Sequence, residues 1–184
     1  MLLLHAGGWV MGNAAMMESE CKAFARHGFE ALSVEYPLKD YFGSLRVAER
    51  AAAWRRRQPV YAVGWSAGGN LAAMLAARGE VTGAVAVAAP TNLLTWQDDS
   101  YWHDLVPLTR RQRREASPVY CYRRSRTRLL LMHSRGDTVV PYRQSVDLAR
   151  RAHARLVTLS GDHLADHSAL RRSIRWVERD FASR

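Results

Sequence analysis

The stretch of sequence from Tyr61 to Gly69, Tyr-Ala-Val-Gly-Trp-Ser-Ala-Gly-Gly, decides the fold. The residues of 60–63 are β-branched, aromatic or small, which is typical of a strand buried on both faces. From Asn70 to Ala77, leucine and methionine recur at helical spacing. The pattern therefore predicts that Ser66 lies on the turn between a buried strand and a helix.

The five residues around this serine, Gly64-Trp65-Ser66-Ala67-Gly68, have the G-x-S-x-G form of a nucleophile elbow. Small flanking residues allow a turn sharp enough to lift the serine oxygen above the sheet. A serine among glycines also occurs in ordinary turns, so the motif alone leaves both interpretations open.

The composition is that of one globular domain. The chain has 184 residues, of which 48% are hydrophobic, and no apolar stretch approaches the roughly 20 residues that cross a bilayer. The apolar run 1–4 is interrupted at once by His5, so it lacks the charged start and the length of a signal peptide. We expect a cytoplasmic protein in which Cys21 and Cys121 are thiols outside any metal site, because neither has a Cys or His at ligand spacing.

The formal net charge of +10 comes almost wholly from arginine, which clusters at 55–57, 110–114 and 123–128. Such clusters would permit contact with nucleic acid or a membrane surface. They are more often solvated helix faces and loops. We therefore expect neither a nucleic-acid nor a membrane partner.

Apolar runs alternate with amphipathic stretches along the chain, which is typical of parallel strands joined by helices. This alternation predicts an α/β fold, a mostly parallel doubly wound sheet of about six strands with helices on both faces, in a single domain spanning 1–184. The strands are expected at 1–4, 30–36, 60–63, 82–89, 128–133 and 156–159. The helices are expected at 14–27 with Asn13 as cap, at 44–57, at 70–77, at 141–153 and at the C-terminus, where Leu170, Ile174, Val177 and Phe181 form the apolar stripe.

The alternation breaks down in the segment 91–127, which carries several aromatic residues and ends in an arginine cluster. Segments this long are usually functional or disordered. The sequence leaves two interpretations open: a short cover over a pocket, or a segment that packs against its own domain.

Three polar side chains follow separate predicted strands: Ser66, Asp137 and His163. Ligands of open parallel sheets bind at the carboxyl ends of the strands, so we expect these side chains to meet there. A histidine can take the serine proton during attack, and an aspartate can hold the imidazole in the correct tautomer. The chain order Ser, Asp, His is that of α/β-hydrolases. His167, four residues further on, is the rival base.

The first predicted strand leads into His5-Ala6-Gly7-Gly8. Glycines allow backbone N–H groups to approach a substrate oxygen closely, so Gly7 and Gly8, with the N–H of Ala67, are the predicted oxyanion hole. We expect His5 itself to be a structural hydrogen-bonding residue. A glycine-rich turn that binds nothing is the alternative.

These segments resemble the hormone-sensitive-lipase-like group of α/β-hydrolase carboxylesterases. The run 5–9 is similar to that group's His-Gly-Gly-Gly motif, with Ala6 replacing a glycine, and 64–71 is similar to its Gly-Asp-Ser-Ala-Gly-Gly-Asn-Leu elbow, with Trp65 replacing the acid. The resemblance implies a minimal α/β-hydrolase that cleaves carboxylic esters without a metal or organic cofactor. Members of that group have earlier strands and often a cap, so we expect the strand at 30–36 to lie near a sheet edge and the chain to form a homodimer or otherwise protect that edge.

The function that we expect is hydrolysis of a small-molecule, short-chain ester. The acyl group is predicted to rest near Trp9, Trp65 and Trp96. Two alternatives stay open at this point: an amide, formamide or peptide hydrolase that uses the same triad, and a non-catalytic binding protein that keeps the fold.

Overall fold

The computed structural model describes residues 1–54, 58–96, 105–122, 125–164 and 166–184. Strands and helices alternate along most of this part of the chain. The strands are β1 (Leu2–Leu4), β2 (Leu32–Ser33), β3 (Tyr61–Trp65), β4 (Gly83–Val87), β5 (Arg128–Ser134) and β6 (Arg155–Leu159). The helices are η1 (Ala14–Met17), α1 (Glu18–Arg26), α2 (Tyr41–Trp54), α3 (Ala67–Arg78), α5 (Arg110–Glu115), α6 (Pro118–Cys121), α7 (Arg143–Ala152) and α8 (Ser168–Ala182).

The six strands form one sheet in the order β2-β1-β3-β4-β5-β6, and every neighbouring pair is parallel. Leu4 of β1 pairs with Gly64 of β3, so the glycine-rich loop and the elbow leave adjacent strand ends. The predicted α/β fold with a parallel sheet of about six strands is confirmed. The segment expected at an edge does lie there, as β2, although only two of its residues are strand; the dimer stays a prediction.

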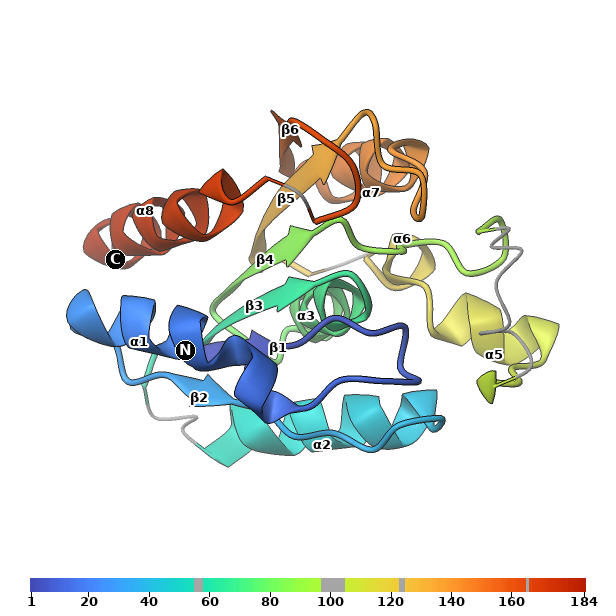
Figure 1. Ribbon diagram of the computed structural model, residues 1–184, viewed down its shortest axis with the longest axis horizontal. Coiled ribbons are helices and arrows are strands. Elements are labelled where there is room, and N and C mark those ends of the chain that lie inside the picture. Colours follow the sequence, from blue (N-terminus) through green and yellow to red (C-terminus); the bar gives the residue numbers. More distant parts are fainter. Residues whose placement is uncertain (55–57, 97–104, 123–124, 165) are drawn as a thin grey trace.

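Helices cover both faces of the sheet. Figure 1 shows α1 and α8 on one side of it and α3 and α7 on the other. Each face has its own apolar cluster, with Phe24 and Val177 in the cluster under α1 and α8, and Leu45 and Leu148 in the cluster under α2, α3 and α7. The doubly wound arrangement follows from strands that are apolar on both faces.

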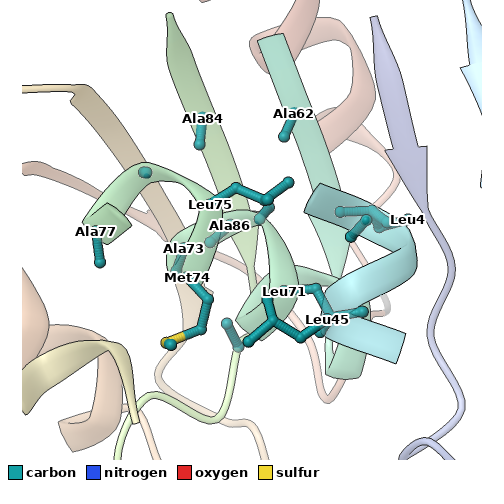
Figure 2. Close-up of a cluster of buried hydrophobic side chains, with 14 of the residues drawn as sticks. Leu4, Leu45, Ala62, Leu71, Ala73, Met74, Leu75, Ala77, Ala84 and Ala86 are labelled. Carbon is teal, nitrogen blue, oxygen red and sulfur yellow. The ribbon is translucent and has the colours of Figure 1, made fainter. Parts of the chain in front are cut away.

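Helix α3 is buried over nearly its whole length, because it lies between the centre of the sheet and the helices outside it. Small side chains on the strands let the helix approach closely: Figure 2 shows Leu75 of α3 near the alanines Ala62, Ala84 and Ala86, and Leu71 beside Leu45 of α2. Full burial of one leucine contributes about 1.5–3 kcal/mol. This packing fixes the direction of α3, and with it the position of the serine that precedes the helix.

The predicted element boundaries shift where side chains provide caps that the pattern did not show. Helix α2 begins at Tyr41 rather than at residue 44, because Asp40 accepts the Gly43 N–H at 2.8 Å. Asn13 makes no side-chain cap, and the N–H of Ala14 is instead donated to Glu35, 2.6 Å away. The predicted helix over 14–27 is therefore divided into a 3₁₀ turn and α1.

The described part of the segment 91–127 packs against its own domain. Gln144 of α7 accepts the backbone N–H groups of Thr91 and Asn92 at 2.9 and 2.6 Å. Asn70 of α3 is fully buried and donates to the carbonyl oxygens of Pro90 and Ala116 at 2.7 and 3.1 Å. Residues 97–104, on which the prediction of a cover also depends, lie outside the described residues. The same holds for residues 55–57, 123 and 124 of the arginine clusters.

Two further observations concern the helices. Phe181, predicted on the apolar stripe of the last helix, is 52% exposed; it is the second-last residue of α8, at the end of the helix. Among the described helices, none has both the length and the apolar character needed to span a membrane.

Candidate active site

Ser66 lies on a strained turn between β3 and α3. Its φ angle is +51°, a conformation that L-residues other than glycine rarely adopt. A Cβ atom at Gly64 would overlap the backbone of Gly68, and one at Gly68 would overlap the carbonyl oxygens of Leu4 and His5. The glycines of the motif are therefore required by close backbone approach, and they hold the serine at the carboxyl edge of the sheet.

The structure brings the three predicted polar side chains into contact. His163 Nε2 lies 3.0 Å from Ser66 Oγ, and His163 Nδ1 lies 2.8 Å from Asp137 Oδ2. A carboxylate offers only acceptors, so Nδ1 carries the proton and donates it to Asp137. Nε2 of the neutral ring then has a lone pair directed at the serine hydroxyl. This is the tautomer that a general base requires.

Asp137 has a fully buried side chain that is held on both carboxylate oxygens. Oδ1 accepts the backbone N–H groups of Val139 and Val140 at 2.9 and 2.8 Å, while Oδ2 accepts from His163 and, at 3.0 Å, from His133 Nε2. Burial alone would raise the pKa of Asp137, but hydrogen bonds from the two histidines and from Val140 outweigh it and hold the pKa well below its usual range. The carboxylate is therefore ionised throughout the neutral pH range.

Side chains also tie the loop after β5 to the loop after β6. Thr138 donates its backbone N–H to Asp162 Oδ1 at 2.8 Å, and its hydroxyl donates to the same carboxylate. Ser134 Oγ donates to the carbonyl oxygen of Gly161. These contacts fix the separation of Asp137 and His163, which come from different loops.

The loop after β1 carries the predicted oxyanion hole. Gly7 and Gly8 have φ angles of +125° and +60°, and a Cβ atom at Gly7 would overlap the Met11 carbonyl group, so the loop conformation requires glycine at that position. His5, which is fully buried, stacks on Tyr36 with ring centroids 4.0 Å apart, and the Tyr36 hydroxyl donates to the His5 carbonyl oxygen at 2.7 Å. His5 is thus a structural residue at the base of this loop, as predicted.

The elbow and this loop meet at the point where the strand order reverses. The chain passes from β1 outward to β2 and then returns to β3 on the other side of β1. Ligands of doubly wound sheets bind in the crevice at such a switch point. The first turn of α3 begins at Ala67 in the same place, and the N–H groups of a first helical turn have no acceptor within the helix. The site therefore brings a serine hydroxyl, an imidazole and backbone N–H donors together at the carboxyl edge of the sheet.

The three tryptophans predicted to touch substrate lie in different environments. Trp9 is fully buried and packs edge-on against Tyr41 and Trp96, and Trp96 is 4% exposed and donates its indole N–H to the Val139 carbonyl oxygen at 3.0 Å. In this structure Trp9 and Trp96 are core residues that brace the site, since ring burial leaves no face for an acyl group. Trp65 is half-buried and lines a groove of about 390 Å³ beside the site.

Of the two candidate bases, the described geometry selects His163. His167 lies at the start of α8 and lines the groove beside Trp65, whereas both contacts to Ser66 and Asp137 come from His163.

Sequence reasoning missed two groups of residues that hold the site. His133 and Ser145 lie behind Asp137, with His133 Nδ1 2.7 Å from Ser145 Oγ. Asn70 and Gln144 connect α3 and α7 to the segment after β4. His133 directly precedes the predicted aspartate loop, which was the one available signal; the buried amides were hidden because a helical pattern shows only apolar spacing.

Comparison with known proteins places this architecture in a family. The prolyl oligopeptidase family matches residues 19–182, which include the elbow, Asp137 and His163. The chain belongs to the prolyl oligopeptidase family. Like the fold itself, this membership is consistent with an α/β-hydrolase domain that carries the serine, aspartate and histidine in that order.

Esterases are found among the relatives of this prolyl oligopeptidase family member. Over 105 residues it is 37% identical to versiconal hemiacetal acetate esterase of Aspergillus parasiticus; the match covers 49% of this chain and 33% of that enzyme, so the matched region spans about a third of the relative's length.

Two solved structures share the fold. Esterase 2 of Thermogutta terrifontis, phosphoramylated by tabun, superposes with a TM-score of 0.82 at 18% identity, covering 99% of this chain and 81% of that one. A truncated carbohydrate esterase from gut microbiota superposes with a TM-score of 0.86 at 16% identity, covering 97% of this chain and 84% of that one. At these identities the likeness establishes the fold.

Proposed function

We propose that the chain is a serine carboxylic ester hydrolase acting on short-chain esters, with Ser66 as nucleophile, His163 as general base and Asp137 as the group that orients the base. The observation that carries the proposal is the single imidazole ring of His163, which contacts the serine hydroxyl at 3.0 Å and the buried carboxylate at 2.8 Å. Nucleophile, base and orienting group within hydrogen-bond reach are the signature of an activated serine.

The reaction proceeds in two halves. In the first, His163 Nε2 takes the Ser66 proton as Oγ attacks the ester carbonyl carbon, and the imidazolium then protonates the departing alkoxide, leaving an acyl group on Ser66. In the second, His163 takes a proton from water, the hydroxide attacks the acyl carbon, and the carboxylic acid leaves as Oγ regains its proton. Asp137 stays ionised throughout and stabilises the imidazolium.

The negative charge on the carbonyl oxygen is held by backbone N–H groups of Gly7, Gly8 and Ala67. Support comes from the placement of the glycine loop and the first turn of α3 at adjacent strand ends. A donor already aimed at the oxyanion needs no reorganisation during reaction, and loss of one such donor costs about 100–1,000-fold in rate.

An ester rather than a peptide is the substrate favoured by the relatives, whose names are those of an acetate esterase and a carbohydrate esterase. The likeness of the glycine loop and the elbow to the motifs of the hormone-sensitive-lipase-like esterases favours a substrate of that group, a carboxylic ester. The acyl group is short, because the rings of Trp9 and Trp96 are buried and leave Trp65, beside a groove of about 390 Å³, as the predicted tryptophan that substrate can reach.

A second candidate is hydrolysis of a peptide or another amide by the same residues, which the family match favours. The chemistry differs only in the leaving group, which is an amine in place of an alkoxide and is likewise protonated by His163 as it departs. Relative rates on an ester and on an amide of the same acyl group decide between the two candidates.

The decisive experiment combines covalent labelling with a substrate panel. A fluorophosphonate probe followed by peptide mapping should label Ser66, and Ser66→Ala should abolish labelling while the exposed-serine control Ser19→Ala should not. His163→Ala should lower the rate on p-nitrophenyl acetate by about 10⁴-fold or more, with little effect of His167→Ala.

Three outcomes would oppose the proposal. Faster hydrolysis of p-nitrophenyl palmitate than of the acetate contradicts the short acyl group, and faster hydrolysis of a proline-containing peptide p-nitroanilide favours the peptidase. No labelling of Ser66 together with salt-sensitive nucleic-acid binding favours a non-catalytic protein.

A further inference from the structure

A second histidine lies on the same carboxylate oxygen as the base. His133 Nε2 is 3.0 Å from Asp137 Oδ2, the oxygen that also accepts from His163. The side chains of His133 and Asp137 have no solvent exposure. The reaction described above does not use this ring. Burial of an imidazole and a carboxylate costs free energy unless the two groups are paired, so the contact itself calls for an explanation.

The partners of His133 determine its tautomer. Nε2 faces Asp137 Oδ2 and, at 2.9 Å, the Val140 carbonyl oxygen. Both are acceptors, so Nε2 must carry a proton. Nδ1 lies 2.7 Å from the hydroxyl of Ser145, which is fully buried on α7 and can donate to the lone pair of a neutral ring. Ser145, His133, Asp137 and His163 thus form one continuous chain of hydrogen bonds.

Other groups lie close to this chain of hydrogen bonds, among them Arg135, whose guanidinium carbon is 5.4 Å from the centre of the Tyr142 ring. Tyr142 presents its ring edge-on to His133 at 5.8 Å between centroids. Asp162, on the loop after β6, also interacts electrostatically with Asp137, and it accepts hydrogen bonds from Thr138 and from the backbone N–H of His163. Among the described residues, His133 and His163 are therefore the two whose side chains donate to Asp137 Oδ2.

We propose that His133 is a positioning residue for the proposed ester hydrolysis: its Nε2–H holds Asp137 Oδ2 toward His163 and draws off part of the negative charge on that oxygen. An aspartate with its full charge on His163 would stabilise the imidazolium more strongly and keep the base protonated to higher pH. Sharing the oxygen between two donors leaves enough charge to orient His163 while limiting how strongly Asp137 stabilises the imidazolium.

Two substitutions of similar size separate donation to Asp137 from simple filling of space. The amide nitrogen of His133→Gln can reach the position of Nε2 and donate to Asp137, whereas the amide of His133→Asn reaches only the position of Nδ1, beside Ser145. We expect His133→Asn to lower kcat for p-nitrophenyl acetate on the order of 10-fold or more, with KM nearly unchanged; losses of this size follow removal of the hydrogen-bond partner behind a ligating residue in metal sites. The acid limb of its pH–rate profile should move to higher pH, and His133→Gln should restore both.

Equal losses in the two variants with an unmoved acid limb would overturn the proposal, since a packing role predicts that result. Full activity of His133→Asn with a wild-type profile would also overturn it.

A measurement that needs no turnover separates this inference from the proposed function on which it rests. In ¹⁵N NMR spectra of the wild-type protein, His133 should be the Nε2–H tautomer; an Nδ1–H tautomer would refute the inference even if His133→Asn does not fold. The His163 ring should titrate at higher pH in His133→Asn than in His133→Gln. If the wild type hydrolyses none of the esters but shows these NMR signatures, the proposed function fails while the role of His133 in setting the charge on Asp137 stands.

Discussion

The substitution Asp137→Asn tests the site most directly, because it removes one charge and almost nothing else. Oδ1 would still accept the N–H groups of Val139 and Val140, so the loop after β5 keeps its conformation. The new amide nitrogen would take the place of Oδ2 and point two hydrogens at His163 and His133. A ring nitrogen can accept such a hydrogen only if it is unprotonated. His163 would therefore turn to the Nε2–H tautomer, which cannot take the proton of Ser66.

The structure sets the size of the effect. Opposite unit charges 2.8 Å apart attract by about 6 kcal/mol at an effective dielectric constant of about 20, which corresponds to about four orders of magnitude in rate. His133 shares Oδ2 and the His163 side chain is 15% exposed, and both facts reduce the attraction. We therefore expect kcat/KM to fall about 10³- to 10⁴-fold, a loss of about 4–5.5 kcal/mol of transition-state stabilisation.

The assay is steady-state hydrolysis of p-nitrophenyl acetate from pH 5 to pH 9, with thermal unfolding as the check on folding. Asp162→Asn is the matched control, because Asp162 lies on the neighbouring loop, accepts from Thr138 and from the His163 backbone, and keeps its Oδ1 acceptor after substitution. The control should retain at least about a tenth of wild-type activity. If Asp137→Asn retains that much while folded, the carboxylate does not orient the base and the reasoning fails.

Three further predictions concern the parts that hold the site. Gly68→Ala should destabilise the fold by about 3 kcal/mol or more and abolish labelling of the nucleophile, since its Cβ would overlap the Leu4 carbonyl oxygen; a fully active, equally stable variant in urea denaturation contradicts this. Asn70→Leu should cost about 3 kcal/mol in the same measurement, because the buried Pro90 carbonyl oxygen loses its donor and the Tyr41 hydroxyl loses the Asn70 acceptor, leaving Tyr41 to donate to Ala116 alone; a cost below about 1 kcal/mol would show that these groups find other partners. Burial raises the pKa of Asp180, but hydrogen bonds from Tyr61 and two arginines outweigh it and leave the pKa lowered; its stabilisation, about 2 kcal/mol, is therefore complete above the unfolded value near pH 4 and is lost as the pH falls through the folded value. The difference in unfolding free energy between wild type and Asp180→Asn should be smaller at pH 3 than at pH 6. A difference that stays constant with pH would refute this assignment.

Local pattern predicted the elements of this chain well where the pattern had a physical cause. The apolar strands, the helical spacing after the elbow and the stop at Gly79, which has a φ angle of +73°, all follow from side-chain periodicity and backbone freedom. Boundaries failed where a distant side chain supplied the cap, as Glu35 does for Ala14. Two of the three predicted substrate tryptophans, Trp9 and Trp96, lie in the core, because aromatic residues near a site fill the interior as readily as they line a pocket.

By itself, the sequence determined which residues end strands and where the backbone requires glycine. It also determined that a serine, an aspartate and a histidine follow three separate strands in that order. Only the tertiary structure decided which histidine lies within hydrogen-bond distance of that serine, how two loops are tied together by Thr138 and Asp162, and that His133 shares the carboxylate with His163. The physical reason is that periodicity and turn chemistry act over a few residues, whereas a hydrogen bond depends on a distance of about 3 Å between atoms that packing alone brings together.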